Sequence, residues 1–299
     1  MQYPPADNAT GNYNLFIVGR KAIGIIMKNF KVGLQLFSIR DAMEKDMDAA
    51  LKAVKEMGYD CVEFAGYFGK PAEEVRAILD KYNLKCISVH CSYESILDEP
   101  QKHVNYLKTI GAEYCAIPSL KENKHKGHEA FDKAAKEITQ VAALLKENGI
   151  QLLYHNHDFE FHKYEGKFLL DWLYETIPAD FLQPQIDTCW VRYAGYDPCE
   201  YIAKYAGRIK VLHLKDFVCK NLTPFPLYDL NGNTEKAQNC DDGFEFRPVG
   251  HGIQDFPAIL DAAEKAGIDC VIVEQDEWPT ATSMESAKQS CEYLKSLGL

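Results

Sequence analysis

Carboxylate, imidazole and ammonium side chains follow several short apolar segments of this 299-residue chain. They occur after the fifth to eighth such segments, in the stretches 154–161 (Tyr-His-Asn-His-Asp-Phe-Glu-Phe), 185–187 (Gln-Ile-Asp), 213–216 (His-Leu-Lys-Asp) and 273–276 (Val-Glu-Gln-Asp). Oxygen and imidazole donors bind divalent ions such as Mn²⁺, Mg²⁺, Co²⁺ and Zn²⁺, and no thiolate belongs to this set. If the four stretches meet in the fold, they form a site for such an ion.

Each of these residues also has a purely structural interpretation. Asp187 before Thr188 can be a helix N-cap, and Lys215 and Asp216 can form a surface ion pair. His90, at the end of an earlier segment, can be a hydrogen-bonded core residue. Such roles do not readily explain carboxylate or imidazole groups after four successive segments, so we interpret the set as a metal and catalytic site.

The elements that must position these residues alternate along the chain. Short apolar runs with turn residues nearby predict eight strands, at 32–37, 61–64, 86–90, 114–117, 151–155, 183–186, 210–214 and 270–273. Amphipathic runs between them predict helices, among them 46–57, 131–148, 256–266 and one that begins at Pro71. Alternation of this kind is typical of parallel strands joined by right-handed crossovers.

Eight such units predict an α/β fold, a single (β/α)8 TIM barrel, with its chemistry at the C-terminal ends of the strands. An open nucleotide-binding sheet would need a glycine-rich turn after its first strand, and residues 35–41 contain no glycine. We expect residues 1–28 to be a poorly ordered extension and residues 29–299 to form the catalytic domain. The long stretch 217–254 is predicted to cover the substrate, with a short extra strand near 244–249 outside the barrel.

Composition limits the partners and the compartment. The chain has 33 Lys and Arg against 44 Asp and Glu, a net charge of −11. A protein with this negative charge repels phosphate backbones and anionic membranes. We therefore expect neither nucleic acid nor membrane as a partner. Ten cysteines form no Cys-x-x-Cys pair, and several lie in apolar runs, which is typical of reduced, buried thiols in the cytoplasm.

The chain resembles the xylose-isomerase-like barrel superfamily, in its sugar phosphate isomerase/epimerase branch, over roughly residues 30–296. The motifs that carry the resemblance are 155–161, 185–187, 213–216, 248–252 (Pro-Val-Gly-His-Gly) and 273–276. The resemblance implies a divalent metal held by Glu, Asp, His and Glu from four strands, and Asp187, His213 and Glu274 match three of those positions.

The first of the four ligands departs from the family pattern. Ketose epimerases carry a glutamate at the end of the fifth strand, where this chain has Tyr154, and Glu160 aligns with a glutamate that holds substrate in those enzymes. Either Glu160 reaches the metal, or His157 or water completes the ligand set. The departure also removes a presumed catalytic base, which speaks against simple ketose 3-epimerase chemistry.

The family reaction removes a proton beside a carbonyl, so the resemblance implies a role for each polar group. Glu274 or His157 is the expected base, Lys215 the cation beside the developing oxyanion, and Glu160 a further member of the catalytic and metal set. Groups expected to contact the substrate come from several strands and loops: Gln35, Glu63, His90, His155, Arg247, Trp190 and Trp278.

We expect a metal-dependent sugar isomerase or epimerase that acts on a ketose or keto-sugar and can form homo-oligomers. The alternative is a metal-dependent lyase or dehydratase acting on an inosose or a 3-keto-glycoside, since elimination needs no base on the second face. A metal-dependent nuclease of the endonuclease IV type is disfavoured by the acidic charge. A non-catalytic sugar-binding barrel would have to keep the metal ligands without using them.

Overall fold

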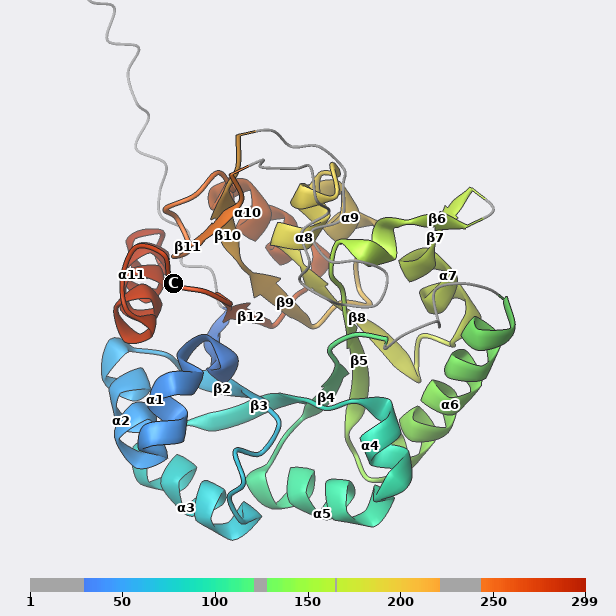
Figure 1. Cartoon of the computed structure of the whole chain (residues 1–299), viewed down its shortest axis with the longest axis horizontal. Coiled ribbons are helices and arrows are strands. Elements are labelled where there is room, and N and C mark those ends of the chain that lie inside the picture. The colour runs from blue at the N-terminus through green and yellow to red at the C-terminus, as the bar shows by residue number, and fades with distance from the viewer. Residues whose placement is uncertain (1–29, 121–127, 165, 221–242) are drawn as a thin grey trace, which may run out of the picture.

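The chain folds as a closed barrel of eight parallel strands with helices around it (Figure 1). The computed structural model describes residues 30–120, 128–164, 166–220 and 243–299, so the predicted extension 1–28 lies outside the described residues. The barrel strands are β1 (Lys31–Gln35), β2 (Cys61–Ala65), β3 (Lys85–His90), β4 (Tyr114–Ile117), β5 (Gln151–His155), β8 (Leu182–Asp187), β9 (Val211–Leu214) and β12 (Cys270–Val273). The predicted TIM barrel is confirmed.

Strand pairing closes the barrel in sequence order. Lys31–Leu34 of β1 pair with Cys270–Val273 of β12, so the first and last barrel strands are neighbours. Each predicted strand coincides with an observed one to within two residues. The first differs most from its prediction, because β1 ends at Gln35 and residues Leu36–Ile39 form a short 3-10 helix, η1. There the Gln35 side chain accepts a hydrogen bond from the Phe37 N–H and so ends the strand.

The predicted helices form with the expected end signals. Helix α2 (Met47–Met57) begins at the N-cap Asp46, which accepts from the Ala49 N–H, and ends at Gly58 with φ of 106°. The remaining helices are α1 (Arg40–Lys45), α3 (Ala72–Tyr82), α4 (Tyr93–Asp98), α5 (Pro100–Ile110), α6 (His128–Glu147), α7 (Leu169–Thr176), α8 (Thr188–Tyr193), α9 (Pro198–Lys204), α10 (Phe256–Ala266) and α11 (Ser283–Ser296), with a second 3-10 turn, η2 (Phe159–Phe161). Within the described ranges, no helix is long and apolar enough to span a membrane.

Two short antiparallel ribbons lie outside the barrel: β6 (Lys163–Tyr164) with β7 (Lys167–Phe168), and β10 (Asp216–Val218) with β11 (Glu245–Arg247). Strand β11 is the extra strand predicted near 244–249. The expected substrate cover falls largely on residues 221–242, outside the described residues, so it stays a prediction.

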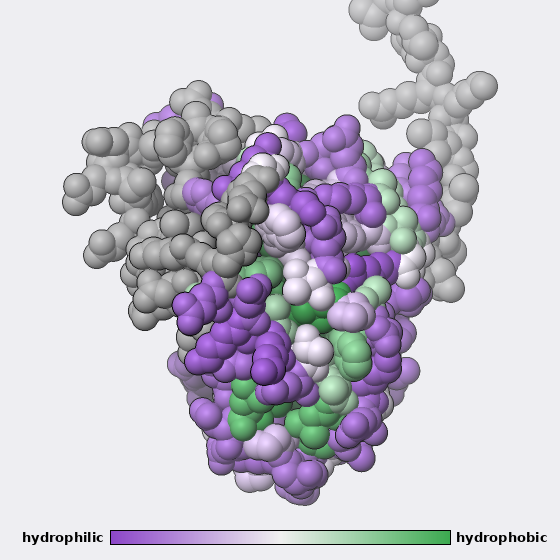
Figure 2. All heavy atoms as spheres, turned by 90° about the vertical axis from the view of Figure 1, so that its right-hand side faces the viewer, coloured by the Kyte–Doolittle hydropathy of each residue, from purple (hydrophilic) through white to green (hydrophobic). Residues whose placement is uncertain are grey.

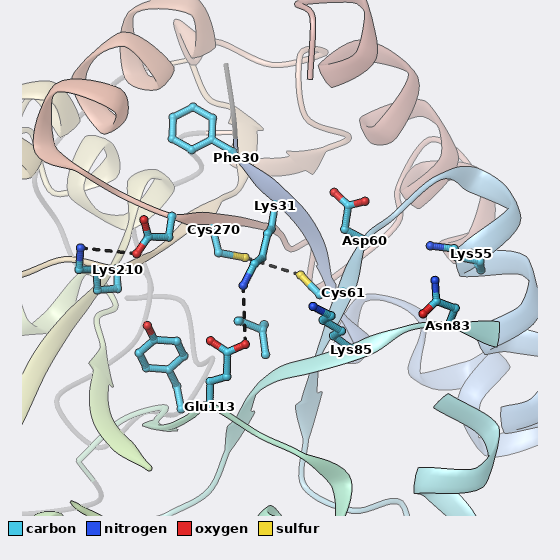
Figure 3. Close-up of a pocket in the computed structure, with 13 residues that line it drawn as sticks. Phe30, Lys31, Lys55, Asp60, Cys61, Asn83, Lys85, Glu113, Lys210 and Cys270 are labelled. Carbon is cyan, nitrogen blue, oxygen red and sulfur yellow. Dashed lines mark hydrogen bonds and ion pairs between the residues drawn. The ribbon is translucent and has the colours of Figure 1, made fainter. Parts of the chain in front are cut away.

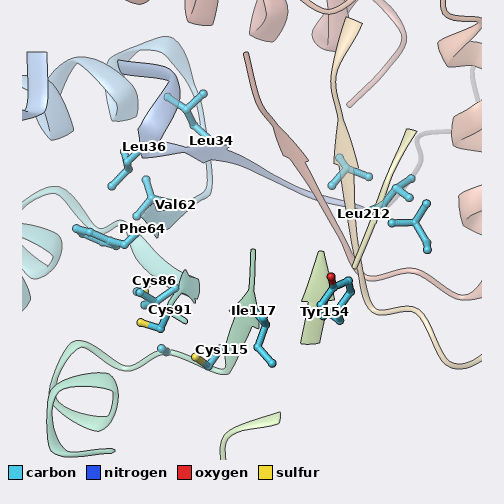
Figure 4. Close-up of a cluster of buried hydrophobic side chains, with 14 of the residues drawn as sticks. Leu34, Leu36, Val62, Phe64, Cys86, Cys91, Cys115, Ile117, Tyr154 and Leu212 are labelled. Atoms are coloured by element: carbon cyan, nitrogen blue, oxygen red, sulfur yellow. The ribbon is translucent and has the colours of Figure 1, made fainter. Parts of the chain in front are cut away.

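The two largest apolar clusters of the described residues lie on either side of the barrel wall. The larger one lies between the barrel and its helices, and Figure 4 shows part of it, with Leu34, Val62, Phe64 and Tyr154 directed away from the barrel interior. A smaller cluster fills the barrel itself: Cys61, Ile87, Ala116, Leu153, Val211, Cys270 and Ile272. Figure 2 shows an outer face that is mostly hydrophilic with apolar patches between, as expected where helices turn their apolar sides toward the barrel.

The N-terminal end of the barrel holds a cavity of about 670 Å³ (Figure 3). Its rim carries ion pairs, among them Lys31 with Glu113 at 3.6 Å, and the thiols of Cys61 and Cys270 lie 3.6 Å apart at its inner end. Within the described ranges, both groups of side chains that can hold a metal lie at the opposite end of the barrel. Chemistry is therefore expected at the C-terminal end, although the cavity there, of about 500 Å³, is smaller than this one.

Candidate active site

Four predicted site residues meet at the C-terminal end of the barrel. His155 ends β5, Asp187 ends β8, His213 lies in β9 and Glu274 follows β12. Each offers a ligand atom within 4.8 Å of the others, and all four side chains are buried. Three of them are the predicted ligands, and the fourth is His155, which we expected to contact substrate.

Asp187 fills both of the roles that the sequence suggested. Its Oδ1 accepts from the N–H groups of Cys189 (2.8 Å) and Trp190 (3.3 Å), so it caps helix α8. Its Oδ2 is buried and has no hydrogen-bond partner among the described residues. The Lys215 Nζ lies 3.3 Å from this oxygen, and the two imidazoles and two carboxylates of the cluster, with no thiolate among them, suit a divalent metal. The residues present therefore fit such an ion.

Lys215 lies directly beside this cluster. Its Nζ is 3.0 Å from Glu274, 3.3 Å from Asp187 and 3.2 Å from both carboxylate oxygens of Asp276. Burial alone would lower the pKa of Lys215, but the three carboxylates outweigh it and raise that pKa well above its usual value. The side chain is therefore a fixed positive charge, 1% exposed, beside the candidate metal ligands.

Glu63 contacts the imidazoles of His213 and His90. One of its carboxylate oxygens accepts from Gln35 Nε2 (2.8 Å) and the other from Gln185 Nε2 (2.6 Å). His213 Nε2 lies 2.7 Å and His90 Nε2 2.9 Å from Glu63 Oε1. The network fixes both rings, and Glu63 and Gln35 stand behind His90 instead of lining the cavity described below.

His213 is bonded on both ring nitrogens. Its Nδ1 lies 2.9 Å from Glu274 Oε2, opposite the contact with Glu63. Burial lowers the pKa of His213, but the carboxylates of Glu63 and Glu274 have the larger effect and raise it to about 10. Both carboxylates thus favour the charged form of this ring.

Glu160 is not brought into the cluster. Its carboxylate accepts from the Tyr154 hydroxyl and from the His157 backbone N–H, each at 2.7 Å, and burial raises its pKa to about 8. The Tyr154 hydroxyl also accepts from the Leu120 N–H at 3.2 Å. Both side chains thus stabilise the loop after β5, and His155, the next residue along the strand, takes the position at the metal cluster.

A cavity of about 500 Å³ opens above these groups. Of the predicted residues, His90, His155, His157, Lys215 and Glu274 line it. It is lined in addition by Phe37, Arg40, Ala65, Pro118, Ser119, Phe159, Asp276 and Glu277. Burial, with the charge of Lys215 added, lowers the pKa of the His157 imidazole to about 3, so this ring is neutral.

Three other predicted contacts lie elsewhere. Arg247 does not line the cavity, because its guanidinium donates to Glu245 (2.6 Å) and to the Phe246 carbonyl (2.8 Å). Trp190 is fully buried, 5.9 Å from the Phe244 ring, and Trp278 packs on the Arg40 guanidinium. These side chains build the walls and rim instead of offering a ring face to substrate.

Comparison with known proteins agrees with this geometry. Residues 51–297 match the model of the xylose isomerase-like TIM barrel family, which is most of the chain. The chain belongs to this family. The resemblance expected from the sequence motifs is thereby confirmed.

The proteins similar to this xylose isomerase-like barrel include some named as dehydratases and some named as isomerases or epimerases. The inosose dehydratase of Mesomycoplasma hyopneumoniae (strain 7448) is 26% identical over 300 residues, covering 91% of this chain and 97% of the relative. A sugar phosphate isomerase/epimerase from Parabacteroides distasonis has the same fold, with a TM-score of 0.72, 19% identity and coverage of 90% and 94%. The IOLI protein, solved with a binding zinc atom, is similar in fold at a TM-score of 0.67, 17% identity and coverage of 90% and 98%.

Proposed function

We propose that this protein is a divalent-metal-dependent dehydratase that eliminates water from an inosose or a similar cyclic polyhydroxy ketone. This was the alternative from the sequence, and the relatives named inosose dehydratase favour it over the isomerase that we placed first. The observation that carries the proposal is that β5 presents the His155 imidazole to the cluster, where ketose epimerases would carry a carboxylate base. Tyr154 faces Glu160 and the Leu120 N–H, away from the cavity lining.

Elimination of water beside a carbonyl requires one base, a place for negative charge, and an acid for the leaving hydroxyl. A divalent ion bound by His155, Asp187, His213 and Glu274 would supply Lewis acidity to the substrate carbonyl. Lys215 adds a fixed ammonium that stabilises the developing oxyanion.

His157 is our proposed base, and the negative charge that develops on the substrate would raise the pKa of its ring from the low value that burial and Lys215 impose. Its neutral ring lines the cavity with its centroid 5.2 Å from that of His155, and it stacks on Phe159 at 5.4 Å, which fixes its plane. After the proton has moved to His157, the same imidazolium is positioned to protonate the leaving hydroxyl, so one residue serves both steps on one face of the ring. His90 is the group of the Glu63 network that lines the cavity, and we assign it a substrate hydroxyl.

The test is the identity of the product. The protein is stripped of metal, reloaded with Mn²⁺, Co²⁺, Zn²⁺ or Mg²⁺, and incubated with an inosose in D₂O, with products followed by NMR and mass spectrometry. We expect metal-dependent loss of one water molecule, abolished by Asp187→Asn. Asp180→Asn is the matched control, because Asp180 is exposed and paired with Lys146 on the outside of the barrel.

A product that has lost no water, is inverted at one carbon and carries deuterium there would show an epimerase instead. Loss of water at the same rate in the metal-free protein would refute the role of the cluster.

A further inference from the structure

Arg40 is a cavity-lining cation that the sequence did not single out. Its guanidinium carbon lies 4.1 Å from the Phe37 ring centroid and 4.5 Å from that of Trp278. Its Nη1 donates to the Phe37 carbonyl at 2.9 Å. Contact with two aromatic rings limits the directions in which the remaining N–H groups can find a partner.

The surrounding rim holds Arg40 in place. The Trp278 Nε1–H donates to the Ser38 carbonyl at 2.8 Å, and the Gln275 N–H donates to the Ser38 hydroxyl at 2.9 Å. These bonds join the loop after β1 to the loop after β12, which follow adjacent strands of the closed barrel (Figure 1). The guanidinium is therefore largely positioned before any ligand arrives, which lowers the entropy cost of using it.

Arg40 also differs from Lys215 in its charge balance. Lys215 contacts three carboxylates, whereas no carboxylate oxygen of the described residues lies within 4.0 Å of an Arg40 nitrogen. A guanidinium has several N–H donors in one plane, which suit two acceptor oxygens side by side. Its unused donors are available to a ligand in the cavity.

We propose that Arg40 and Phe37 form a rim subsite that binds two adjacent hydroxyl oxygens of a neutral cyclic polyol. Phe37 is 38% exposed and offers an apolar face to the C–H groups of the ring. The carboxylates of Glu274, Asp276 and Glu277 line the same cavity and disfavour a phosphorylated ligand. The subsite rests on the proposed function and specifies how its substrate is selected.

Binding of an inositol tests the subsite without any reaction, because an inositol has the hydroxyl ring but no carbonyl. Calorimetry on metal-loaded wild type and Arg40→Gln should show affinity weaker by at least about tenfold in the variant, because the loss of a single hydrogen bond to a charged group already corresponds to that factor. Arg40→Lys should not restore affinity, since a lysine lacks the planar pair of donors. The matched control Arg76→Gln, which removes an exposed guanidinium on α3, should bind as wild type.

Deoxy-inositols, each lacking one hydroxyl, supply the decisive readout. Two of them, lacking adjacent hydroxyls, should each bind wild type about tenfold more weakly and bind Arg40→Gln no more weakly than the parent inositol does. Independent, additive losses for every analogue would overturn the subsite and leave Arg40 a structural residue. Tighter, Arg40-dependent binding of an inositol phosphate would overturn the preference for a neutral ligand. Arg40-dependent inositol binding in an enzyme that fails to dehydrate an inosose would refute the proposed reaction alone.

Discussion

Asp216 offers a sharp test of how the loop beside the active site is held. Its Oδ2 accepts from the N–H groups of Gly250 (3.0 Å) and Gly252 (2.7 Å), and its Oδ1 from those of Phe217 (2.9 Å) and Gln254 (3.2 Å). The side chain is fully buried. One carboxylate thus satisfies four backbone donors around the Pro-Val-Gly-His-Gly motif, which explains the motif as a structural one and fixes the residue next to Lys215.

Asp216→Asn keeps the shape but leaves one acceptor oxygen, so two N–H groups would face an NH₂ group. Hydrogen bonds to a charged acceptor contribute roughly 1.5–3 kcal/mol each, and relief of the buried charge offsets part of the loss. We expect a destabilisation of about 2–4 kcal/mol, measured as a lower midpoint of urea unfolding at neutral pH.

Asp255→Asn is the matched control in the same region. Asp255 accepts from the Ala258 N–H as an exposed N-cap, a position where asparagine is as good as aspartate. Its unfolding midpoint should be unchanged. An Asp216→Asn protein that unfolds at the wild-type midpoint would refute our account of the loop.

Three further changes test the framework. Burial raises the pKa of Asp171, but Lys204, Tyr205 and Tyr201 lower it more, so Asp171→Asn should destabilise the protein at neutral pH by about 1–3 kcal/mol. The difference in unfolding free energy between wild type and variant should shrink as the pH falls below about 4, where Asp171 becomes protonated. A difference that does not change with pH would contradict this account. Gly33→Ala places a Cβ 2.4 Å from the Ile272 side chain and should destabilise the protein by about 1–3 kcal/mol through overpacking, seen as a lower thermal midpoint. An unchanged midpoint would refute the close contact. Thr282→Ala removes the capping box of α11 and should lower the free energy of unfolding in urea by about 1 kcal/mol. An unaltered urea unfolding curve would contradict a stabilising role for this cap.

Sequence reasoning predicted the barrel well because its signal is local and repeated. Each strand and helix has its own periodicity and end residues, and the order of the units then leaves few topologies. The rim position of Asp187, His213 and Glu274 followed from the same rule, since the C-terminal ends of parallel strands meet.

The place of His155 within the cluster was not predicted, although a signal existed. Successive residues of a strand point to opposite sides, and Leu152 and Tyr154 pack outward while Leu153 lies inside the barrel. That alternation places His155 inside, whereas alignment to the family drew attention to Tyr154 and Glu160. Arg40 could not have been found in this way, because its position depends on how two loops pack against each other.

The central claim is that His155, Asp187, His213 and Glu274 hold one divalent ion, and metal stoichiometry tests it most directly. Calorimetric titration of the stripped protein with Mn²⁺ or Zn²⁺ should give one tight site in wild type and in Glu160→Gln. His155→Ala and Asp187→Asn should each weaken that site by at least about tenfold. Loss of the site in Glu160→Gln with full binding in His155→Ala would contradict the account and return the fourth ligand to Glu160.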